Sequence, residues 1–138
     1  MTDDQKLTFD GVHHLNFSVT NLERSTAWYT EVLGLTHGWD MEDTNGRGQK
    51  AVLLHPSSPL RIVLSFHRGN DGEPFNEFRT GLDHVAFTAE DRTELERWQT
   101  RFDELGVDHS EIKEGATGWL ITFRDPDNLQ FEIYTQSK

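Results

Sequence analysis

The sequence predicts an α+β fold built from two βαβββ modules. Three observations favour it: a gapless internal repeat, strand-like alternation at the start of each copy, and helical spacing directly afterwards. With 138 residues the chain has the usual length of one domain. We therefore expect a single domain over residues 1–138, with module one at about 11–67, a linker or lid at 68–80 and module two at about 81–135.

The internal repeat aligns residues 11–30 with residues 81–100 without a gap. The identical pairs are Gly11/Gly81, His14/His84, Phe17/Phe87, Trp28/Trp98 and Thr30/Thr100. Both copies end in a Leu-Gly-apolar sequence, at residues 33–35 and 105–107. Two copies at this long period indicate a duplicated supersecondary unit rather than a solenoid.

In the first module, apolar and polar residues alternate over 15–19, which predicts a strand with two different faces. Thr20 and Glu23 have the spacing of a capping box and predict the start of a helix. Gly34 suits the left-handed position after the helix end. Three further strands are predicted near 36–42, 49–55 and 60–67, separated by the turn sequences NGRG and HPSSP.

The second module repeats this order. After its first strand, Asp91 and Glu94 have capping-box spacing, and Leu95, Trp98 and Phe102 recur at helical intervals. Gly106 suits the residue after the helix end. Three further strands are predicted near 107–113, 117–124 and 128–135, with RDPDN as a turn.

Because strand side chains alternate, one face of each sheet can pack under a helix while the other lines a cavity. The expected helix-facing side chains are apolar: Leu15, Phe17, Val19, Ile62, Leu64, Phe66, Val85, Phe87, Ala89, Leu129, Phe131 and Ile133. The opposite face carries a mixed set: His14, Asn16, Ser18, Arg61, Val63, Ser65, His67, His84, Ala86, Thr88, Gln130, Glu132 and Tyr134. Polar groups are costly to bury without partners, so we interpret this second set as a cavity lining.

Three members of this lining form a candidate metal site. His14 and His84 occupy equivalent positions on first strands, and Glu132 lies on the last strand of the second module. Two imidazoles and one carboxylate make a facial triad for a divalent metal, with Fe(II) or Mn(II) favoured and Zn(II) or Ni(II) as alternatives. Val63 occupies the position equivalent to Glu132, so the predicted site keeps open positions suited to catalysis.

Other residues are assigned by their type and position. The candidate catalytic residues are Tyr134 and His67, and the candidate substrate-binding residues are Asn16, Arg61, Thr122 and Trp119. We expect His13 to point to the opposite face from its neighbour His14. The four tryptophans are expected to be mostly core residues, and the acidic residues between Asp40 and Asp43 are expected to be solvated.

Composition narrows the class of protein. With 24 acidic and 13 basic side chains, the formal net charge of −11 disfavours nucleic acids and anionic membrane surfaces as partners. The chain has no cysteine, so any metal must be held by His, Asp or Glu. The apolar runs are too short for a transmembrane span or signal peptide, and we expect a cytoplasmic protein that binds a small-molecule substrate.

Three segments resemble the vicinal oxygen chelate superfamily, which includes glyoxalases, extradiol dioxygenases, fosfomycin-resistance enzymes and bleomycin-binding proteins. These segments are HHLNFSVTNLERSTAWYTEVLGL, GLDHVAFTAED and FRDPDNLQFEIY. The resemblance implies that the paired βαβββ modules form a cupped, incomplete barrel-like sheet around one metal site, commonly in a homodimer, with ligands at His14, His84 and Glu132. It also implies a substrate that chelates the metal through two neighbouring oxygens. The modules of one cup can come from one chain or from two.

The departures from the family pattern leave the reaction open. Glyoxalase I and acyl-CoA epimerases resemble four-ligand sites, which Val63 disfavours. Ring-cleaving dioxygenases and fosfomycin enzymes usually carry Tyr ten residues before the metal-binding Glu, where this chain has Thr122. Our first hypothesis is a dioxygenase-like metalloenzyme. The alternatives are a non-redox, glyoxalase-like lyase or isomerase and a non-catalytic antibiotic- or metabolite-binding protein.

Overall fold

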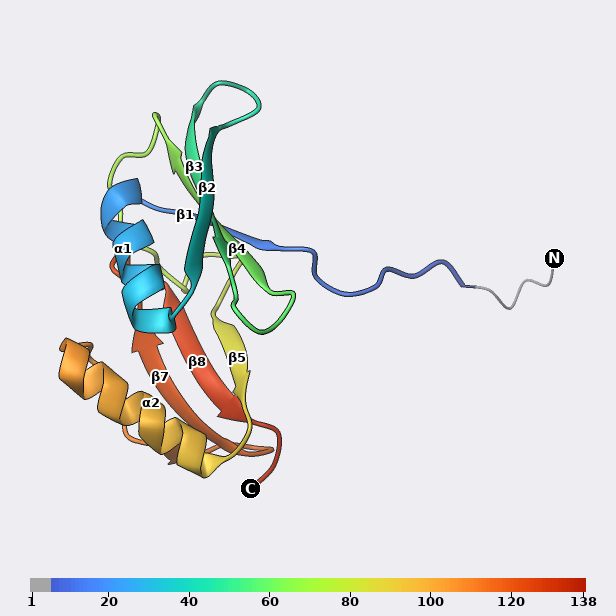
Figure 1. The fold of residues 1–138 in the computed structure, drawn as a ribbon, viewed down its shortest axis with the longest axis vertical. Coiled ribbons are helices and arrows are strands. Elements are labelled where there is room, and N and C mark those ends of the chain that lie inside the picture. Colours follow the sequence, from blue (N-terminus) through green and yellow to red (C-terminus); the bar gives the residue numbers. More distant parts are fainter. Residues whose placement is uncertain (1–5) are drawn as a thin grey trace.

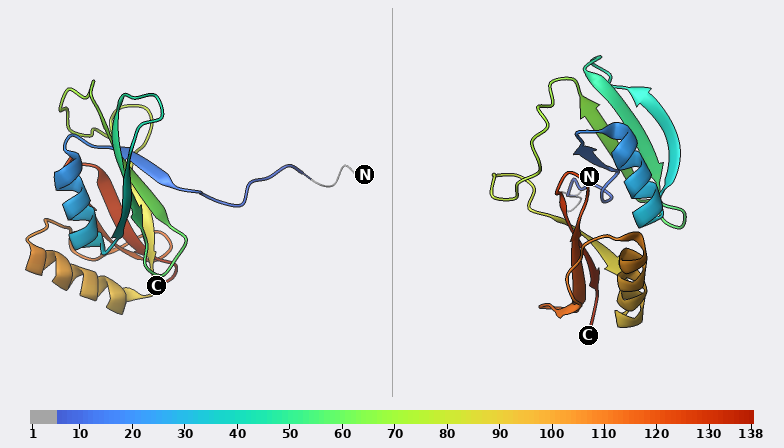
Figure 2. Two further views of the ribbon diagram at one scale, coloured as in Figure 1. Left: turned by 45° about the horizontal axis from the view of Figure 1, so that its top comes forward. Right: turned by 90° about the vertical axis from the view of Figure 1, so that its left-hand side faces the viewer.

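The computed structural model describes residues 6–138, in which two similar modules lie one above the other (Figures 1 and 2). The first module consists of β1 (Leu15–Ser18), α1 (Leu22–Leu33), β2 (Thr36–Glu42), β3 (Gly48–Leu54) and β4 (Arg61–His67). Its four strands form one open sheet in the order β1-β4-β3-β2. Strand β1 is parallel to β4, and the other pairs are antiparallel.

The second module has the same order of elements. It consists of β5 (Val85–Ala89), α2 (Arg92–Leu105), β6 (Lys113–Glu114), β7 (Trp119–Arg124) and β8 (Gln130–Thr135). Its open sheet has the order β5-β8-β7-β6, with β5 parallel to β8. Two open four-stranded sheets with one helix each confirm the predicted α+β fold and the βαβββ order. In residues 6–138, no helix is both long and apolar enough to span a membrane.

One predicted strand is wrong. Residues 107–113 were expected to form a strand, but only Lys113 and Glu114 do so, and His109 contributes a single bridge to Phe123. The imidazole of His109 contacts Asp103 Oδ1 at 2.6 Å and the carbonyl oxygen of Ser110 at 2.7 Å. The segment lies beside β7, where the Ser110 N–H donates to the carbonyl oxygen of Thr122, but the Ser110 hydroxyl rather than its carbonyl accepts from the Thr122 N–H, so regular strand pairing is interrupted.

One predicted helix start is also wrong by one residue. Asn21, not Thr20, caps α1, because its side chain accepts a hydrogen bond from the backbone of Arg24. The cap of α2 at Asp91 is confirmed. The two left-handed glycines after the helices, Gly34 and Gly106, are confirmed as well.

A single apolar core joins the two modules. Phe131 of β8 lies at its centre, and the ring centroids of Phe17 and Tyr29 lie 5.7 and 6.0 Å from that of Phe131. On the side of the second module, Phe87 and Phe123 each lie 5.5 Å away. Aromatic rings at these separations add to the stability that their burial provides. The helix-facing sides of both sheets are therefore buried against one another within one chain.

Two side chains depart from the expected burial. The tryptophans were expected to be mostly core residues, and Trp39 is the exception, at 46% exposed on β2. Asp43 was expected to be solvated, but it is buried and accepts a hydrogen bond from the backbone of Asn45. That bond and the ammonium group of Lys50, 3.3 Å away, lower the pKa of Asp43.

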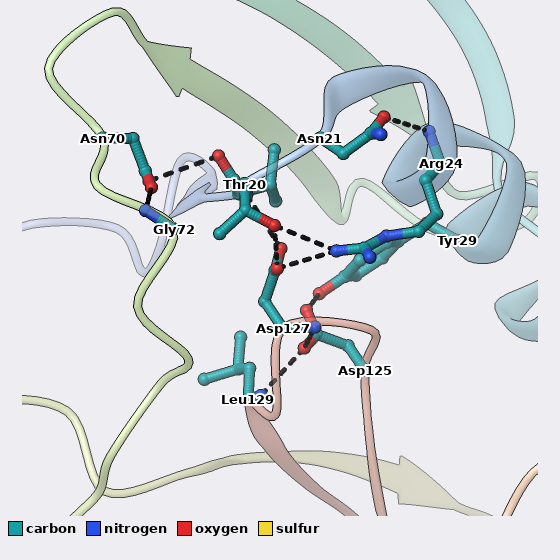
Figure 3. Close-up of polar contacts among 10 residues, drawn as sticks. Thr20, Asn21, Arg24, Tyr29, Asn70, Gly72, Asp125, Asp127 and Leu129 are labelled. Atoms are coloured by element: carbon teal, nitrogen blue, oxygen red, sulfur yellow. Dashed lines mark hydrogen bonds and ion pairs between the residues drawn. The ribbon is translucent and has the colours of Figure 1, made fainter.

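A buried polar cluster, which we call the clasp, joins the start of α1 to the turn between β7 and β8 (Figure 3). Tyr29 Oη donates to Asp125 Oδ2 at 2.6 Å, and Asp125 Oδ1 accepts from the backbone of Asp127 and Leu129. Burial raises the pKa values of both Asp125 and Tyr29. The carboxyl group of Asp125 is thus almost removed from water and depends on these donors.

The second half of the clasp explains the different role of Thr20. Its hydroxyl and its backbone N–H both donate to the carboxylate of Asp127. The guanidinium of Arg24 also contacts Asp127, at 2.9 Å. A side chain engaged across the modules is not available as a helix cap.

The connection between the modules lies against the second one. The backbone of Phe75 donates to the carbonyl oxygen of Asp127 at 2.7 Å. Glu77 pairs with Arg124 at 2.8 Å, and that contact lowers the pKa of Glu77 to about 2. These contacts link Phe75 and Glu77 of the connection to the end of β7 and to the turn that carries the clasp.

The clasp predicts a stability cost for Tyr29→Phe. The variant keeps the ring but removes one donor from the buried Asp125, which costs about 1–3 kcal/mol in the free energy of unfolding. Urea unfolding of the wild type and the variant measures this difference in the free energy of unfolding. Tyr134→Phe is the matched control, because no hydrogen bond of its phenol is found within residues 6–138, and it should change stability by about 0.5 kcal/mol or less. Equal effects of the two variants would contradict the assigned role of Tyr29.

The His109–Asp103 contact predicts a pH-dependent contribution to stability. The hydrogen bond that His109 donates to the Asp103 carboxylate raises the pKa of His109, so the folded protein binds this proton more tightly than the unfolded chain. The contribution is fully present below the unfolded pKa of about 6.5 and is lost as the pH rises through the higher folded value.

Melting temperatures of the wild type and Asp103→Asn should therefore differ most near pH 6 and converge toward about pH 9. Asp40→Asn is the matched control, because Asp40 makes a similar but more exposed contact with His37 at 2.7 Å. A difference between wild type and Asp103→Asn that stays constant over this range would refute the coupling.

Candidate metal centre

Two of the predicted ligands lie together in the second module. His84 immediately precedes β5, and Glu132 lies on the neighbouring strand β8, opposite Ala86. His84 Nε2 is 3.4 Å from Glu132 Oε1. The side chains of His84 and Glu132 are 36% and 18% exposed, so both can be reached from solvent.

Asp83 orients the histidine of this pair. Its Oδ2 lies 2.7 Å from His84 Nδ1, so the carboxylate accepts the Nδ1 proton. This contact assigns the tautomer whose Nε2 lone pair is directed to the side of Glu132. A carboxylate behind a ligating imidazole is a common arrangement at metal sites. Sequence reasoning missed Asp83, although its place beside a repeated histidine was a usable signal.

His14 occupies the equivalent position in the first module, directly before β1. Its Nδ1 lies 2.8 Å from Nδ1 of His13, so the expectation that His13 points away is wrong. His13 and Asp83 are equivalent in the internal repeat. In both modules, the preceding side chain thus engages Nδ1 of the candidate ligand and leaves Nε2 available.

A single chain does not bring the three predicted ligands together. Within residues 6–138, no group of three His, Cys, Asp or Glu side chains could hold a metal ion. His14 lies on the sheet of the first module, while His84 and Glu132 lie on the sheet of the second. Strands β1 and β5 each have a neighbour on one side only. Each chain therefore presents a two-ligand half-site and a separate third ligand, both beside free strand edges.

The other candidate residues of the second module lie on two faces. Thr122 is opposite Glu132 in the sheet, and Tyr134 is two residues further along β8 on the same face. A side chain at Gly115 would overlap the phenol of Tyr134, so the turn before β7 packs closely on this ring. Trp119 lies on the helix-facing side, where Arg92 is 4.2 Å from its ring centre. The structure does not bring Trp119 to the face of Glu132.

The candidate residues of the first module share the face opposite α1. Asn16 Oδ1 accepts a hydrogen bond from the Ser65 hydroxyl at 2.7 Å. Arg61 lies at the start of β4, with its guanidinium 5.9 Å from the ring centre of Trp39. His67 lies at the end of the same strand, half-buried and opposite Gly48. These residues line the concave face of the first sheet rather than the neighbourhood of His84.

The family model for the Glyoxalase/Bleomycin resistance protein/Dioxygenase superfamily matches residues 11–133. The chain belongs to this superfamily. Its solved relatives include a glyoxylase/bleomycin resistance protein/dioxygenase domain from Frankia sp. EAN1pec, with a TM-score of 0.85 and 32% sequence identity. That similarity covers 94% of this chain and 99% of the Frankia chain. The βαβββ arrangement is therefore that of the superfamily.

Two curated members of the superfamily show its chemical range. The metallothiol transferase FosB of Shouchella clausii (strain KSM-K16) is 27% identical over 129 residues, which cover 91% of this chain and 80% of FosB. The putative ring-cleaving dioxygenase MhqA of Bacillus subtilis (strain 168) is 24% identical over 131 residues. That match covers 95% of this chain but 41% of MhqA. Superfamily membership alone is thus compatible with more than one reaction.

A wide hollow within residues 6–138 lacks all three candidate ligands in its lining. It has a volume of about 710 Å³ and lies between α1 and the second module, lined in part by Trp28, His109 and Arg124. Of the predicted site residues, it touches only Thr122. The concave faces that carry the candidate ligands are open surfaces in one chain, so an enclosed site requires something to cover them.

Proposed function

We propose that the protein is a metal-dependent, dioxygenase-like enzyme that acts on a small oxygen-rich organic substrate. The divalent metal would be held by His84 and Glu132 of one copy and His14 of a second copy in a homodimer. The observation that carries this proposal is the half-site, in which Nε2 of His84 lies 3.4 Å from the Glu132 carboxylate. A lone pair and a carboxylate directed to one point form part of a coordination sphere.

The homodimer follows from the position of the third donor. His14 directly precedes β1, an edge strand of the first sheet. In the second sheet, His84 directly precedes the edge strand β5, and Glu132 lies on the neighbouring strand β8. The shared core fixes the two modules of one chain, so the missing donor has to come from another chain. A twofold pair would supply each half-site with one His14 and form two equivalent sites.

The donor set fits a catalytic divalent metal. Two imidazoles and one carboxylate suit Fe(II) or Mn(II), and they also accept Zn(II) or Ni(II). When bound, such a metal supplies Lewis acidity to a chelated substrate and, for Fe(II) or Mn(II), reactivity toward dioxygen. Val63 is apolar at the position equivalent to Glu132, and it leaves coordination positions for substrate oxygens.

The remaining polar side chains of the two concave faces would bind the substrate and move protons. Tyr134 and Thr122 flank Glu132 on one face. Asn16 and Arg61 belong to the other face and would complete the site from the second copy. His67 lies farther along β4, where it can exchange a proton with solvent. We leave Trp119 out, because it lies on the helix-facing side.

A redox-neutral reaction is the second candidate for the same site. Thr122 places an aliphatic hydroxyl opposite Glu132, where ring-cleaving enzymes and fosfomycin enzymes usually have a phenol, and this favours a lyase or isomerase. The metal requirement and the need for dioxygen distinguish the two reactions. Turnover that needs dioxygen and Fe(II) or Mn(II) supports the oxygenase, whereas anaerobic turnover with Zn(II) supports a lyase or isomerase.

The ligand assignment predicts the loss of metal binding in three variants. His14→Ala, His84→Ala and Glu132→Gln should each lower Mn(II) affinity by about two orders of magnitude or more, because each removes one of three protein donors. Equilibrium dialysis of untagged protein with Mn(II) alone measures this. His55→Ala is the control, because His55 lies on the β3–β4 turn, outside the proposed site. Unchanged Mn(II) binding in all three variants would refute the proposed site.

Mixing two inactive variants tests whether a site is shared between chains. If His14 and the half-site come from different copies, a mixed dimer of His14→Ala and His84→Ala contains one intact site. Co-refolded equimolar chains should then bind Mn(II) at about a quarter of the wild-type sites. A mixture that binds no more than its parents would show that the site is not formed in this way.

The Asp83 contact predicts a weaker metal site without loss of a ligand. Asp83→Asn removes the carboxylate that orients His84, and such changes lower metal affinity about 10–100-fold. The measurement is again Mn(II) dialysis. Asp108→Asn, at an exposed aspartate beside β7, is the matched control and should bind like the wild type. Equal affinities of the two variants would show that Asp83 does not support the site.

A further inference from the structure

A cavity lies between the two modules, on the helix-facing sides of their sheets. It has a volume of about 270 Å³, and both modules contribute to its walls. The apolar wall residues include Leu33 of α1, Ile62 of β4, Phe87 of β5, Trp98 of α2 and Ile133 of β8. None of the three candidate metal ligands belongs to this lining. The cavity is therefore separate from the proposed metal centre.

The apolar side chains around the cavity are incompletely packed. Leu33, Phe87 and Trp98 contact the core but are only partly buried. Protein interiors are normally filled to the density of an organic crystal, and side chains that border a gap lose contacts. Water fills such a gap poorly, because an apolar wall offers it few hydrogen bonds. A small apolar molecule would gain contacts by occupying the space.

The lining of the cavity carries no acidic or basic residue. Asp, Glu, Lys and Arg make up 27% of the chain, but none of them lines this cavity. An ionised ligand would leave water without meeting an opposite charge, and that is costly. The cavity thus favours a neutral ligand over an anion or a cation.

Two hydrogen-bonding side chains of the lining come from the β3–β4 turn. His55 Nδ1 accepts a hydrogen bond from the backbone of Ser57 at 3.3 Å, which assigns the ring proton to Nε2. The Ser58 hydroxyl accepts from the backbone of Leu60 at 3.3 Å and keeps its own proton to donate. No acceptor for either proton is found in the part of the chain that the structure describes. The turn therefore offers donors to a ligand that carries an acceptor.

We infer that this cavity is a second binding site, which takes a small, neutral, apolar molecule with one oxygen acceptor such as a carbonyl group. A water molecule fills about 30 Å³ in the liquid, so a cavity of about 270 Å³ holds about nine non-hydrogen atoms. The apolar body would contact Phe87 and Trp98, and the oxygen would accept from the β3–β4 turn. This inference goes beyond the proposed function and does not depend on the metal.

Three probes with the same ring and nearly equal size test the class of ligand. The full-length protein is titrated in a calorimeter with acetophenone, with ethylbenzene and with benzoate. We expect acetophenone to bind about fivefold more tightly than ethylbenzene, because one net hydrogen bond changes affinity by about this factor. Benzoate should bind at least about tenfold more weakly than acetophenone, since its charge meets no cation in the cavity.

Variants assign the binding to this cavity. The double variant His55→Ala/Ser58→Ala should bind acetophenone and ethylbenzene equally, because both donors are removed. Leu60→Trp should fill the cavity and abolish the binding of both probes; the donor variant tests the inference independently if Leu60→Trp does not fold. His37→Ala is the matched control, because His37 is an exposed histidine outside the lining, and it should keep the fivefold preference.

The outcomes separate this site from the proposed metal centre. His84→Ala should bind acetophenone as the wild type does, and the double donor variant should keep its Mn(II) affinity within about twofold of the wild type. Equal binding of acetophenone and ethylbenzene to the wild type, no binding of either, or a preference that survives the loss of both donors would overturn the inference.

Two further results would also overturn it. Loss of acetophenone binding in His84→Ala would assign the probe to the metal-binding face. A dimer dissociation constant that rises on addition of acetophenone would show that a second copy of the chain, and not a small molecule, occupies the cavity.

Discussion

The shared aromatic core around Phe131 is the constraint on which the rest of the structure depends. Rings from both modules surround Phe131, and the clasp adds buried hydrogen bonds between α1 and the β7–β8 turn. Separating the modules would expose these rings and leave the Asp125 carboxylate without its phenol donor, and both changes are costly. The helix-facing sides are therefore committed within one chain, and the concave faces stay open.

The acidic turn between β7 and β8 stabilises the contact between the two modules. Asp125 and Asp127 come from RDPDN, a segment that resembles the terminal motif of the superfamily. Their carboxylates accept hydrogen bonds from backbone N–H groups, Tyr29, Thr20 and Arg24, and none of these partners is a candidate metal ligand. We attribute this turn to the joining of modules, so its acidic residues are poor candidates for metal binding even though they are close together.

Local patterns predicted most elements of the fold, and long-range contacts account for the exceptions. Alternation and capping located the strands and α2 because those signals lie within a few residues of one another. Thr20 has cap spacing, but Asp127, more than a hundred residues away, takes its hydroxyl. Residues 107–113 have apolar positions typical of a strand and lie beside β7, but side-chain bonds of His109 and Ser110 take the place of the regular backbone pairing.

The candidate ligands were also predicted from local patterns. The internal repeat pairs His14 with His84, and the alternation of side chains along β8 assigns Glu132 to its face. The exposure of Trp39 was not predictable, because tryptophan is usually buried and only the register shows that its side of β2 is the concave one. Nor could the repeat show how the two modules of a chain are oriented. That orientation depends on which aromatic rings meet in the core, and a pattern of single residues does not specify it.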